Sequence, residues 1–234
     1  MSDEAMRLAR LLMQKAAATL LQQKSASLFS IKHGRFSDFE GALGEVKRAL
    51  SPYCHIRLMN QNARCALLYV YQPDLLLRGL KLPAVRRFLL SCGYQEDALE
   101  ACARAQVQGC EKRCALCQRQ ASSVHLEMLL DHLSARFDHL YCPHEVGIFL
   151  DYPLRDVLGF IRFEGKRAKC IGCWKVYSDP EEAKRRFAKY REAEHLVQAK
   201  IADEVNPMHG LLKLYSERNL NDAYSVEEAL LQLG

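Results

Sequence analysis

A short apolar run, Ala66–Tyr71, limits the possible folds of this chain more than any other part of the sequence. It belongs to a β-prone stretch, Arg64–Tyr71, which follows a second such stretch, Cys54–Met59, after the four residues 60–63. This spacing predicts an antiparallel hairpin. Because the later strand is apolar at consecutive positions, both of its faces need cover, and we expect it in the middle of a sheet.

Helical spacing and capping signals dominate the rest of the N-terminal half. Residues 3–24 place apolar side chains every three or four positions, which predicts an amphipathic helix. Ser37 and Glu40 form a capping box that predicts the start of another helix. We expect that helix to end near Ser51, because the residue before a proline is disfavoured in helical geometry.

Similar signals continue through the second half of the chain. A stripe of leucines with a period of 3.6 predicts a helix over residues 123–140. Asp179 followed by Pro180 predicts a helix that extends to about Asp203. The other expected elements are a helix from Pro83 capped by Gly93, a helix over 96–118, a strand over 147–150, a short helix from Pro153, a turn at Gly165 and Lys166 with a strand to Tyr177, and a short helix capped by Ser225.

Together these elements predict the α+β class. We expect a single domain over residues 1–205, in which a small, mainly antiparallel sheet of about four strands is covered by helices. Its parts would be N-terminal helices and the hairpin (1–94), a helical middle (95–141) and a strand-helix-strand-helix motif (142–205). Residues 206–234 are expected to form a helical tail.

Composition narrows the class of protein further. The 234 residues are 49% hydrophobic and 26% charged, which is typical of soluble globular proteins. We find no run of about 18 apolar residues that could span a membrane, and the acidic start is unlike a signal peptide. We therefore expect a cytoplasmic protein without membrane association, whose ten cysteines are mostly reduced thiols.

The most specific motifs lie in residues 143–190. They are PHEVGIFL at 143–150, YPL at 152–154, DV at 156–157, GFI at 159–161, CIG at 170–172, WKVY at 174–177 and EAK at 182–184, with Phe187 and Tyr190. In these motifs the chain resembles the bacterial family called domain of unknown function 3793, and weaker similarity extends the resemblance to about residues 20–195. Two positions depart from the family pattern: Asp151 stands where the family has glycine, and Cys173 stands where it usually has an aromatic or another residue.

The resemblance implies a broad setting rather than a reaction. Members of that family are uncharacterised cytosolic proteins of anaerobic Gram-positive bacteria, encoded beside genes for flavodoxins and for ferrous-iron uptake. The resemblance therefore suggests an accessory protein linked to iron or redox metabolism. It also suggests an acidic protein such as a flavodoxin as a partner.

The loop around His144 is the candidate catalytic site. An imidazole that titrates near neutrality could act as an acid or base, with the carboxylate of Glu145 or Asp156 fixing its tautomer. Alternatively, the two carboxylates satisfy backbone groups of the loop and the next helix, and His144 has no chemical role. The sequence has no glycine-rich phosphate loop and no G-x-S-x-G or H-E-x-x-H motif, so a binding protein is favoured over an enzyme.

Charge is concentrated in one segment. The chain has a formal net charge of +5, and residues 155–191 contain 11 Lys or Arg against 5 Asp or Glu. Such a segment predicts a basic docking face for an acidic protein or a phosphate-bearing ligand, or simply a solvated helix face. Because no nucleic-acid motif accompanies it, specific binding of DNA or RNA is not expected. The candidate ligand- or partner-binding residues are Tyr152, Lys175, Tyr177, Lys184, Arg185 and Arg186.

The cysteines offer two metal hypotheses, neither of which we favour. Cys110, Cys114 and Cys117 have the spacing of radical S-adenosylmethionine iron–sulfur sites, but on a helix they would share one core-facing stripe. Cys114, Cys117, Cys170 and Cys173 could together bind zinc. However, 52 residues separate the two pairs, and on a regular strand the second pair would point to opposite faces.

Three histidines recur every seven residues at 125, 132 and 139. Seven helical residues rise about 10.5 Å, which is too far for two imidazoles to share one ion. We expect these side chains to flank the buried stripe of their helix, and no metal or other cofactor is favoured anywhere in the chain.

Overall fold

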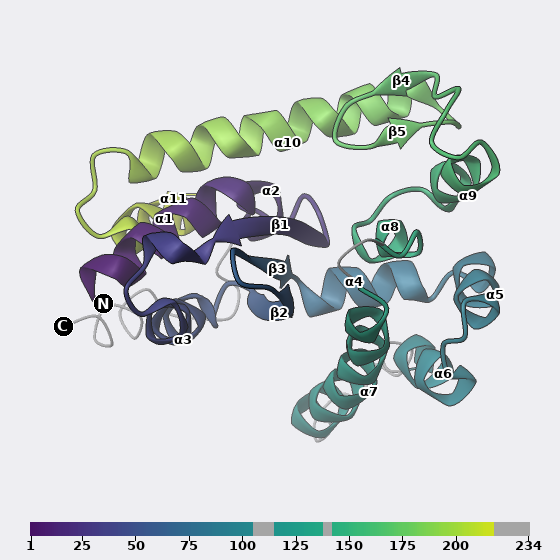
Figure 1. Cartoon of the computed structure of the whole chain (residues 1–234), viewed down its shortest axis with the longest axis horizontal. Coiled ribbons are helices and arrows are strands. Elements are labelled where there is room, and N and C mark those ends of the chain that lie inside the picture. The colour runs from purple at the N-terminus through teal and green to yellow at the C-terminus, as the bar shows by residue number, and fades with distance from the viewer. Residues whose placement is uncertain (105–114, 138–141, 218–234) are drawn as a thin grey trace.

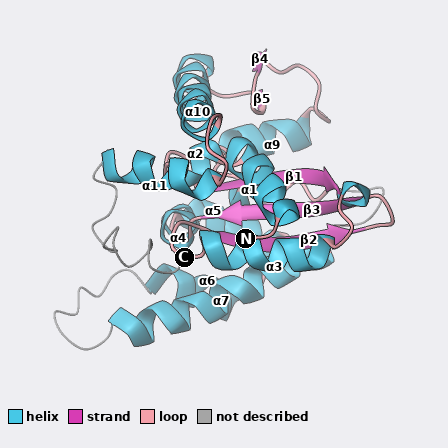
Figure 2. Cartoon of the chain, turned by 90° about the vertical axis from the view of Figure 1, so that its left-hand side faces the viewer, coloured by secondary structure: helices cyan, strands magenta, loops and turns pink. Residues whose placement is uncertain are grey.

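A three-stranded antiparallel sheet separates two hydrophobic cores (Figure 2). A computed structural model of the chain describes residues 1–104, 115–137 and 142–217, without the side chains of 115–123 (Figure 1). The strands are β1 (Ala26–Lys32), β2 (His55–Gln61) and β3 (Cys65–Tyr71), in the order β1-β3-β2. The predicted hairpin and the central place of its second strand are both confirmed.

The residues of β3 alternate between the two cores, as its apolar composition requires. Ala66, Leu68 and Val70 belong to the first core. Tyr69 and Tyr71 belong to the second core, on the opposite face of the sheet. This strand is therefore buried on both sides.

Strand β1 follows the predicted helix over residues 3–24 and lies in residues for which we predicted no element. That helix is instead α1 (Asp3–Lys15) followed by the short α2 (Ala17–Leu20). Gln22 then adopts a φ of 55°, in the left-handed region, which does not continue a right-handed helix. The chain turns there and enters β1, so the prediction of helix up to residue 24 was wrong at its C-terminal end.

The first core is covered by α1, α2, α3 (Phe39–Leu50), α10 (Pro180–Ile201) and α11 (Pro207–Glu217). Helix α10 begins at the predicted Asp179 cap, whose side chain accepts hydrogen bonds from the backbone N–H groups of Glu181 and Glu182. Helix α11 packs against α10 and α1, and its Tyr215 hydroxyl donates to the carbonyl of Leu20. The C-terminal helix is thus part of the first core.

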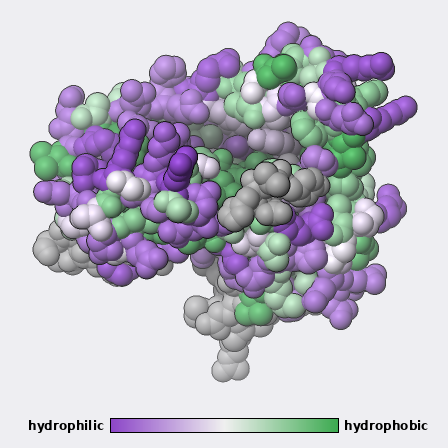
Figure 3. Space-filling view, in the orientation of Figure 1, coloured by the Kyte–Doolittle hydropathy of each residue, from purple (hydrophilic) through white to green (hydrophobic). Residues whose placement is uncertain are grey.

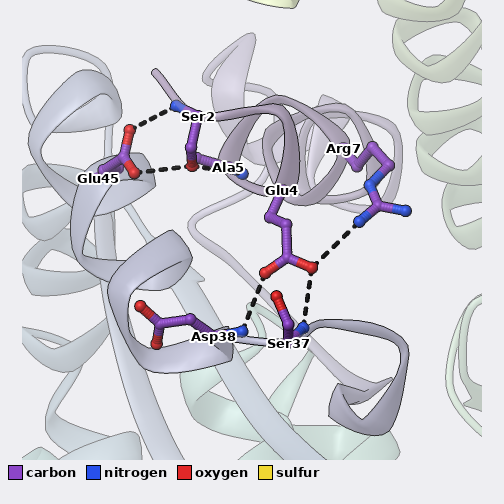
Figure 4. Close-up of polar contacts among 7 residues, drawn as sticks. All are labelled: Ser2, Glu4, Ala5, Arg7, Ser37, Asp38 and Glu45. Carbon is purple, nitrogen blue, oxygen red and sulfur yellow. Dashed lines mark hydrogen bonds and ion pairs between the residues drawn. The ribbon is translucent and has the colours of Figure 1, made fainter.

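Two carboxylates join the start of α1 to α3 (Figure 4). Glu45 accepts hydrogen bonds of 2.7 Å from the backbone nitrogen and the hydroxyl of Ser2. Glu4 accepts bonds of 2.8 and 2.9 Å from the backbone nitrogens of Ser37 and Asp38. These contacts fix the loop that precedes α3.

The predicted cap of α3 was wrong by one residue. Asp38, and not Ser37, is the N-cap, because its side chain accepts a 2.9 Å hydrogen bond from the backbone nitrogen of Gly41. The helix ends at Leu50, close to the predicted end near Ser51.

The second core contains α4 (Pro73–Leu80), α5 (Pro83–Ser91), α6 (Glu96–Arg104), α7 (Ala115–Ala135) and α8 (Val146–Phe149). Helix α5 and its left-handed Gly93 confirm the prediction. Several predictions were wrong here: α4 was missed, and residues 147–149 are helical rather than a strand. Helix α7 continues through the break expected between 118 and 123, and it ends at Ala135 rather than at residue 140. A run of four apolar residues fits a buried strand or a buried helix equally well by pattern.

The predicted segment after Pro153 contains α9 (Leu154–Arg162) and a small hairpin of β4 (Cys170–Ile171) and β5 (Lys175–Val176). The predicted strand up to Tyr177 is thus two short strands, which form a sheet of their own. The α+β class is confirmed. Within the described ranges, none of the helices has the length and apolar character needed to cross a membrane. The helix expected after Ser225 lies outside the described residues.

Candidate functional site

Asp156, a candidate catalytic residue, connects α9 to the β4–β5 hairpin. It is 2% exposed, and its carboxylate accepts hydrogen bonds from the indole nitrogen of Trp174 (2.7 Å) and the backbone nitrogens of Tyr177 (2.8 Å) and Ser178 (2.7 Å). Burial acts to raise the pKa of this carboxyl, but the hydrogen bonds prevail and lower it. The carboxylate is therefore ionised and fully used in holding the hairpin.

Gly159 of α9 allows this helix to lie close to the end of the β4–β5 hairpin. A Cβ atom at Gly159 of α9 would lie 2.4 Å from the Cβ of Tyr177, so only glycine lets the helix approach the strand end so closely. Residues 156–159 of α9 and residues 174–177 of the hairpin, which belong to two of the motifs, therefore pack against each other. Trp174 and Val176 point into the first core, and Lys175 is exposed.

The other two candidate catalytic residues lie at the entry to α8. Glu145 is 2% exposed and forms an ion pair with Arg136, which follows α7. His144 is exposed, and its ring meets the ring of Phe160 edge-on at 5.3 Å between centroids. Both carboxylates near His144 in the sequence therefore have strong structural partners, which supports the structural alternative for Glu145 and Asp156.

A cluster of charged and aromatic residues lies beneath the N-terminal half of α10. We call it the Lys24 cluster, and it consists of Lys24, Asp151, Tyr152, Trp174, Arg186 and Tyr190. The Nζ atom of Lys24 lies 5.6 Å from the ring centroid of Tyr152 and 5.7 Å from that of Tyr190. Tyr152 in turn stacks on Trp174 with ring centroids 4.9 Å apart.

Arg186 is the centre of the cluster's hydrogen bonds. Its Nη2 atom donates to the carboxylate and the backbone carbonyl of Asp151 and to the hydroxyl oxygen of Tyr190, at 2.5, 2.7 and 3.1 Å. Its guanidinium carbon also lies 5.2 Å from the Trp174 ring centroid, a cation–π contact. Arg186 and Tyr190 can share these partners because they are one turn apart on α10.

Four separate chain segments supply these residues. Lys24 comes from the connection between α2 and β1, and Asp151 and Tyr152 from the connection between α8 and α9. Asp151 has a φ of 63°, in the left-handed region that favours glycine, which explains physically why the family pattern has glycine there. Tyr152 and Arg186 were selected as binding candidates from the sequence, but Lys24 and Asp151 were not. The one signal at Asp151 was its departure from the glycine of the family pattern.

Burial shifts several pKa values in the cluster. Burial lowers the pKa of Lys24, as does the nearby charge of Arg186, while Cys173 and Asp151 oppose the shift. Burial raises the pKa of Asp151 against the opposing effects of Arg186 and Lys24. It also raises the pKa of Tyr152 to about 12. Perturbed groups of opposite charge at one place are characteristic of functional sites, although structural networks produce them too.

The remaining ligand-binding candidates lie outside this cluster. Lys184 and Arg185 are exposed on α10 and pair with Glu181 and Glu182 at 2.7 and 3.0 Å. Lys175 donates a 2.8 Å hydrogen bond to the carbonyl of Gly165. Tyr177 stacks on Phe163, with ring centroids 5.9 Å apart.

The metal hypotheses fall partly outside the described residues, because Cys110, Cys114 and His139 are not described, nor is the side chain of Cys117. Cys170 is half-buried against the first core, whereas Cys173 is exposed. Among the described residues, no three His, Cys, Asp or Glu side chains are grouped as a metal site. His132 packs against the ring of Tyr94 at 4.2 Å between centroids.

The solvent-facing side of α9 combines cations and apolar residues. Arg155, Leu158, Ile161 and Arg162 are all exposed and fall within one stripe of the helix; we call this the α9 outer face. Leu158 is 44% exposed and Ile161 39%. Neither arginine forms an ion pair with a described residue, and the guanidinium carbon of Arg162 lies 5.4 Å from the ring centroid of Phe163. Figure 3 shows hydrophobic and hydrophilic residues intermixed at this end of the molecule.

Comparisons with known proteins agree with the resemblance in the motifs. Residues 12–113 and 104–209 match the family described as "Protein of unknown function (DUF3793)". Neither the curated proteins nor the solved structures contain a significant match to the chain. Because the two matched segments together take in most of the sequence, the chain belongs to the DUF3793 family.

Proposed function

We propose that this protein is a cytoplasmic accessory protein that binds an acidic protein partner through the α9 outer face. The observation that carries the proposal is the exposed stripe of Arg155, Leu158, Ile161 and Arg162. Exposed apolar side chains flanked by arginines are typical of protein–protein interfaces, whose energetic centres are enriched in arginine. The arginine fork also suits the carboxylates of an acidic surface.

This placement differs from the one that charge density alone suggests. The dense run Lys184–Arg186 lies on α10, but two of its charges are already paired with Glu181 and Glu182. The third, Arg186, is engaged with Asp151 inside the Lys24 cluster. Arg155 and Arg162 carry charges without such partners among the described residues, so they support docking more strongly.

A flavodoxin is the partner that we propose, in line with the iron or redox setting that the family resemblance suggests. Flavodoxins are strongly acidic, so their surface complements the net charge of residues 155–191. Complementary charge of this kind speeds encounter and weakens with salt. The apolar Leu158 and Ile161 would contribute a part of the affinity that salt does not screen.

The test is isothermal titration calorimetry of the full chain with a purified flavodoxin, at roughly 20 mM and 150 mM salt. We compare the double variant Arg155→Glu/Arg162→Glu with Arg35→Glu/Arg48→Glu, which makes the same charge change at exposed positions outside α9. We expect the α9 variant to bind at least about tenfold more weakly and the control to bind nearly as the wild type does. Equal binding by the wild type and the α9 variant, or no binding by the wild type, would contradict the proposal.

A further inference from the structure

We propose that the Lys24 cluster binds a phosphate group, with Lys24, Arg186 and the Tyr190 hydroxyl as the groups that recognise it. This site is distinct from the α9 outer face, and the inference does not depend on a protein partner. Three observations carry it: two neighbouring cations of which only Arg186 has an ion pair among the described residues, an ammonium group held against two aromatic rings, and the partial exposure of the cluster.

The first observation is the charge balance. Lys24 and Arg186 are the cations of the cluster, and Asp151 is its carboxylate. The pairing is uneven, because the Asp151 carboxylate lies 2.5 Å from Arg186 but forms no ion pair with Lys24. The carboxylates of Glu194 and Glu182 also act on Lys24 and Arg186 respectively, but both are exposed and neither forms an ion pair with these cations. The ammonium group of Lys24 therefore has no ion pair among the described residues. A half-buried charge of this kind is costly unless an anion joins it.

The second observation is the surroundings of Lys24. An ammonium group has three donors, yet the described contacts of Lys24 are the ring faces of Tyr152 and Tyr190. Ring faces stabilise a cation only modestly and leave its donors unused. Burial lowers the pKa of Lys24, and an anion beside it would restore the charged form.

The two cations are also placed to act on the same anion. Arg186 donates a 3.1 Å hydrogen bond to the Tyr190 hydroxyl oxygen, and Lys24 lies over the ring of the same tyrosine. Since that hydroxyl oxygen accepts from Arg186, its own proton is available for a further acceptor. An ammonium, a guanidinium and a hydroxyl proton suit a tetrahedral oxyanion, which accepts several hydrogen bonds at once.

The third observation is access. Lys24 and Asp151 are half-buried rather than sealed, and Gly172 and Cys173 of the hairpin turn are exposed. Tyr152 is half-buried, so its ring is the aromatic group of the cluster that a flat group attached to the phosphate could contact.

The test is isothermal titration calorimetry of the full chain with inorganic phosphate and, separately, with phenyl phosphate; sodium acetate is the carboxylate control. We expect Lys24→Gln to weaken phosphate binding about tenfold or more, the loss typical of one charged hydrogen bond. We expect Asp151→Gly to tighten it, because glycine suits the left-handed backbone and two unpaired cations remain. Lys189→Gln changes an exposed lysine of α10 and should leave binding unchanged.

The opposite signs of the two variants make the inference testable even if one of them folds poorly. Tighter phosphate binding by Asp151→Gly supports it whether or not Lys24→Gln is soluble. Absence of binding by the wild type to both phosphate probes would overturn it, as would weaker binding by Asp151→Gly. Tighter binding of phenyl phosphate than of inorganic phosphate would assign the site to a phosphoester, and the reverse order to the free ion. The Arg155→Glu/Arg162→Glu variant should still bind phosphate, so the docking proposal can fail independently.

Discussion

Residues 151–191 contain two sets of charged side chains that differ in where the fold places them. Asp151, Asp156 and Arg186 point inward and have defined partners there. Arg155 and Arg162 face solvent on α9 without ion-pair partners among the described residues. The inner set holds the hairpin and the Lys24 cluster in place, whereas the outer set is available to a protein partner.

The comparison shows that net charge along the sequence is a weak guide to a docking face. The same types of charged residue contribute differently to the free energy of unfolding when they are buried and when they are exposed. Burial removes solvent screening and raises the cost of losing a partner. Changes to the inner set should therefore alter the free energy of unfolding, and changes to the outer set should alter the affinity for a protein partner.

The largest effect should come from Asp156→Ala. The change leaves the Trp174 indole N–H and two backbone N–H groups without their acceptor, which should cost about 3 kcal/mol or more of unfolding free energy. Urea unfolding followed by fluorescence measures it directly, because Trp174 is the single tryptophan of the chain. Asp179→Ala, which removes the exposed α10 cap, should cost only about 1 kcal/mol. Equal costs for the two variants would contradict the inner role of Asp156.

Lowering the pH should remove the difference in stability between the wild type and Asp156→Ala. The pKa of Asp156 is lowered in the folded protein, so its stabilisation is present above its unfolded pKa of about 4 and is lost as the pH falls through the lower folded value. The stability gap between wild type and Asp156→Ala should therefore narrow below about pH 4. A gap that stays constant down to pH 2 would mean that the carboxylate form is not what holds the hairpin.

Local signals in the sequence predicted much of the fold. The hairpin of β2 and β3, the Asp179 cap and the leucine stripe of α7 each depend on residues close together in the chain. Strand β1 was missed because its pairing with β3 joins residues about 40 positions apart, and no local pattern signals that. The short α8 was predicted as a strand because four buried apolar residues satisfy either structure.

The candidate site was less predictable for a related reason. The Lys24 cluster draws on the connections before β1 and before α9, on the hairpin and on α10, so no spacing in the sequence brings its members together. Lys24 had no signal at all, because its importance lies in the two tyrosine rings beside it. The positive φ of Asp151 was indicated only by the glycine at that position in the family pattern.

The next largest effect should come from Arg186→Met, which keeps an apolar side chain against Trp174 and leaves the half-buried Asp151 carboxylate without its partner. We expect a loss of about 2 kcal/mol in urea unfolding, less than for a fully buried pair because Asp151 retains some solvent. Arg155→Met, on the outer face, should change stability by less than about 0.5 kcal/mol. Adding Asp151→Gly to Arg186→Met should recover part of the loss, since it removes the unpaired carboxylate. A double variant less stable than the single one would contradict this account.

The smallest effect should come from Lys184→Ala/Arg185→Ala. These side chains form exposed pairs within one helix, each worth about 0.3–0.5 kcal/mol, so the stability of the double variant should fall by less than about 1 kcal/mol. Its affinity for a flavodoxin should fall only slightly, because the variant lowers the net charge by two, whereas Arg155→Glu/Arg162→Glu lowers it by four and alters the proposed contact residues themselves. If the double variant binds as weakly as Arg155→Glu/Arg162→Glu, the docking face includes α10. In that case exposure, rather than the absence of an ion pair, decides which cations of α9 and α10 contact the partner.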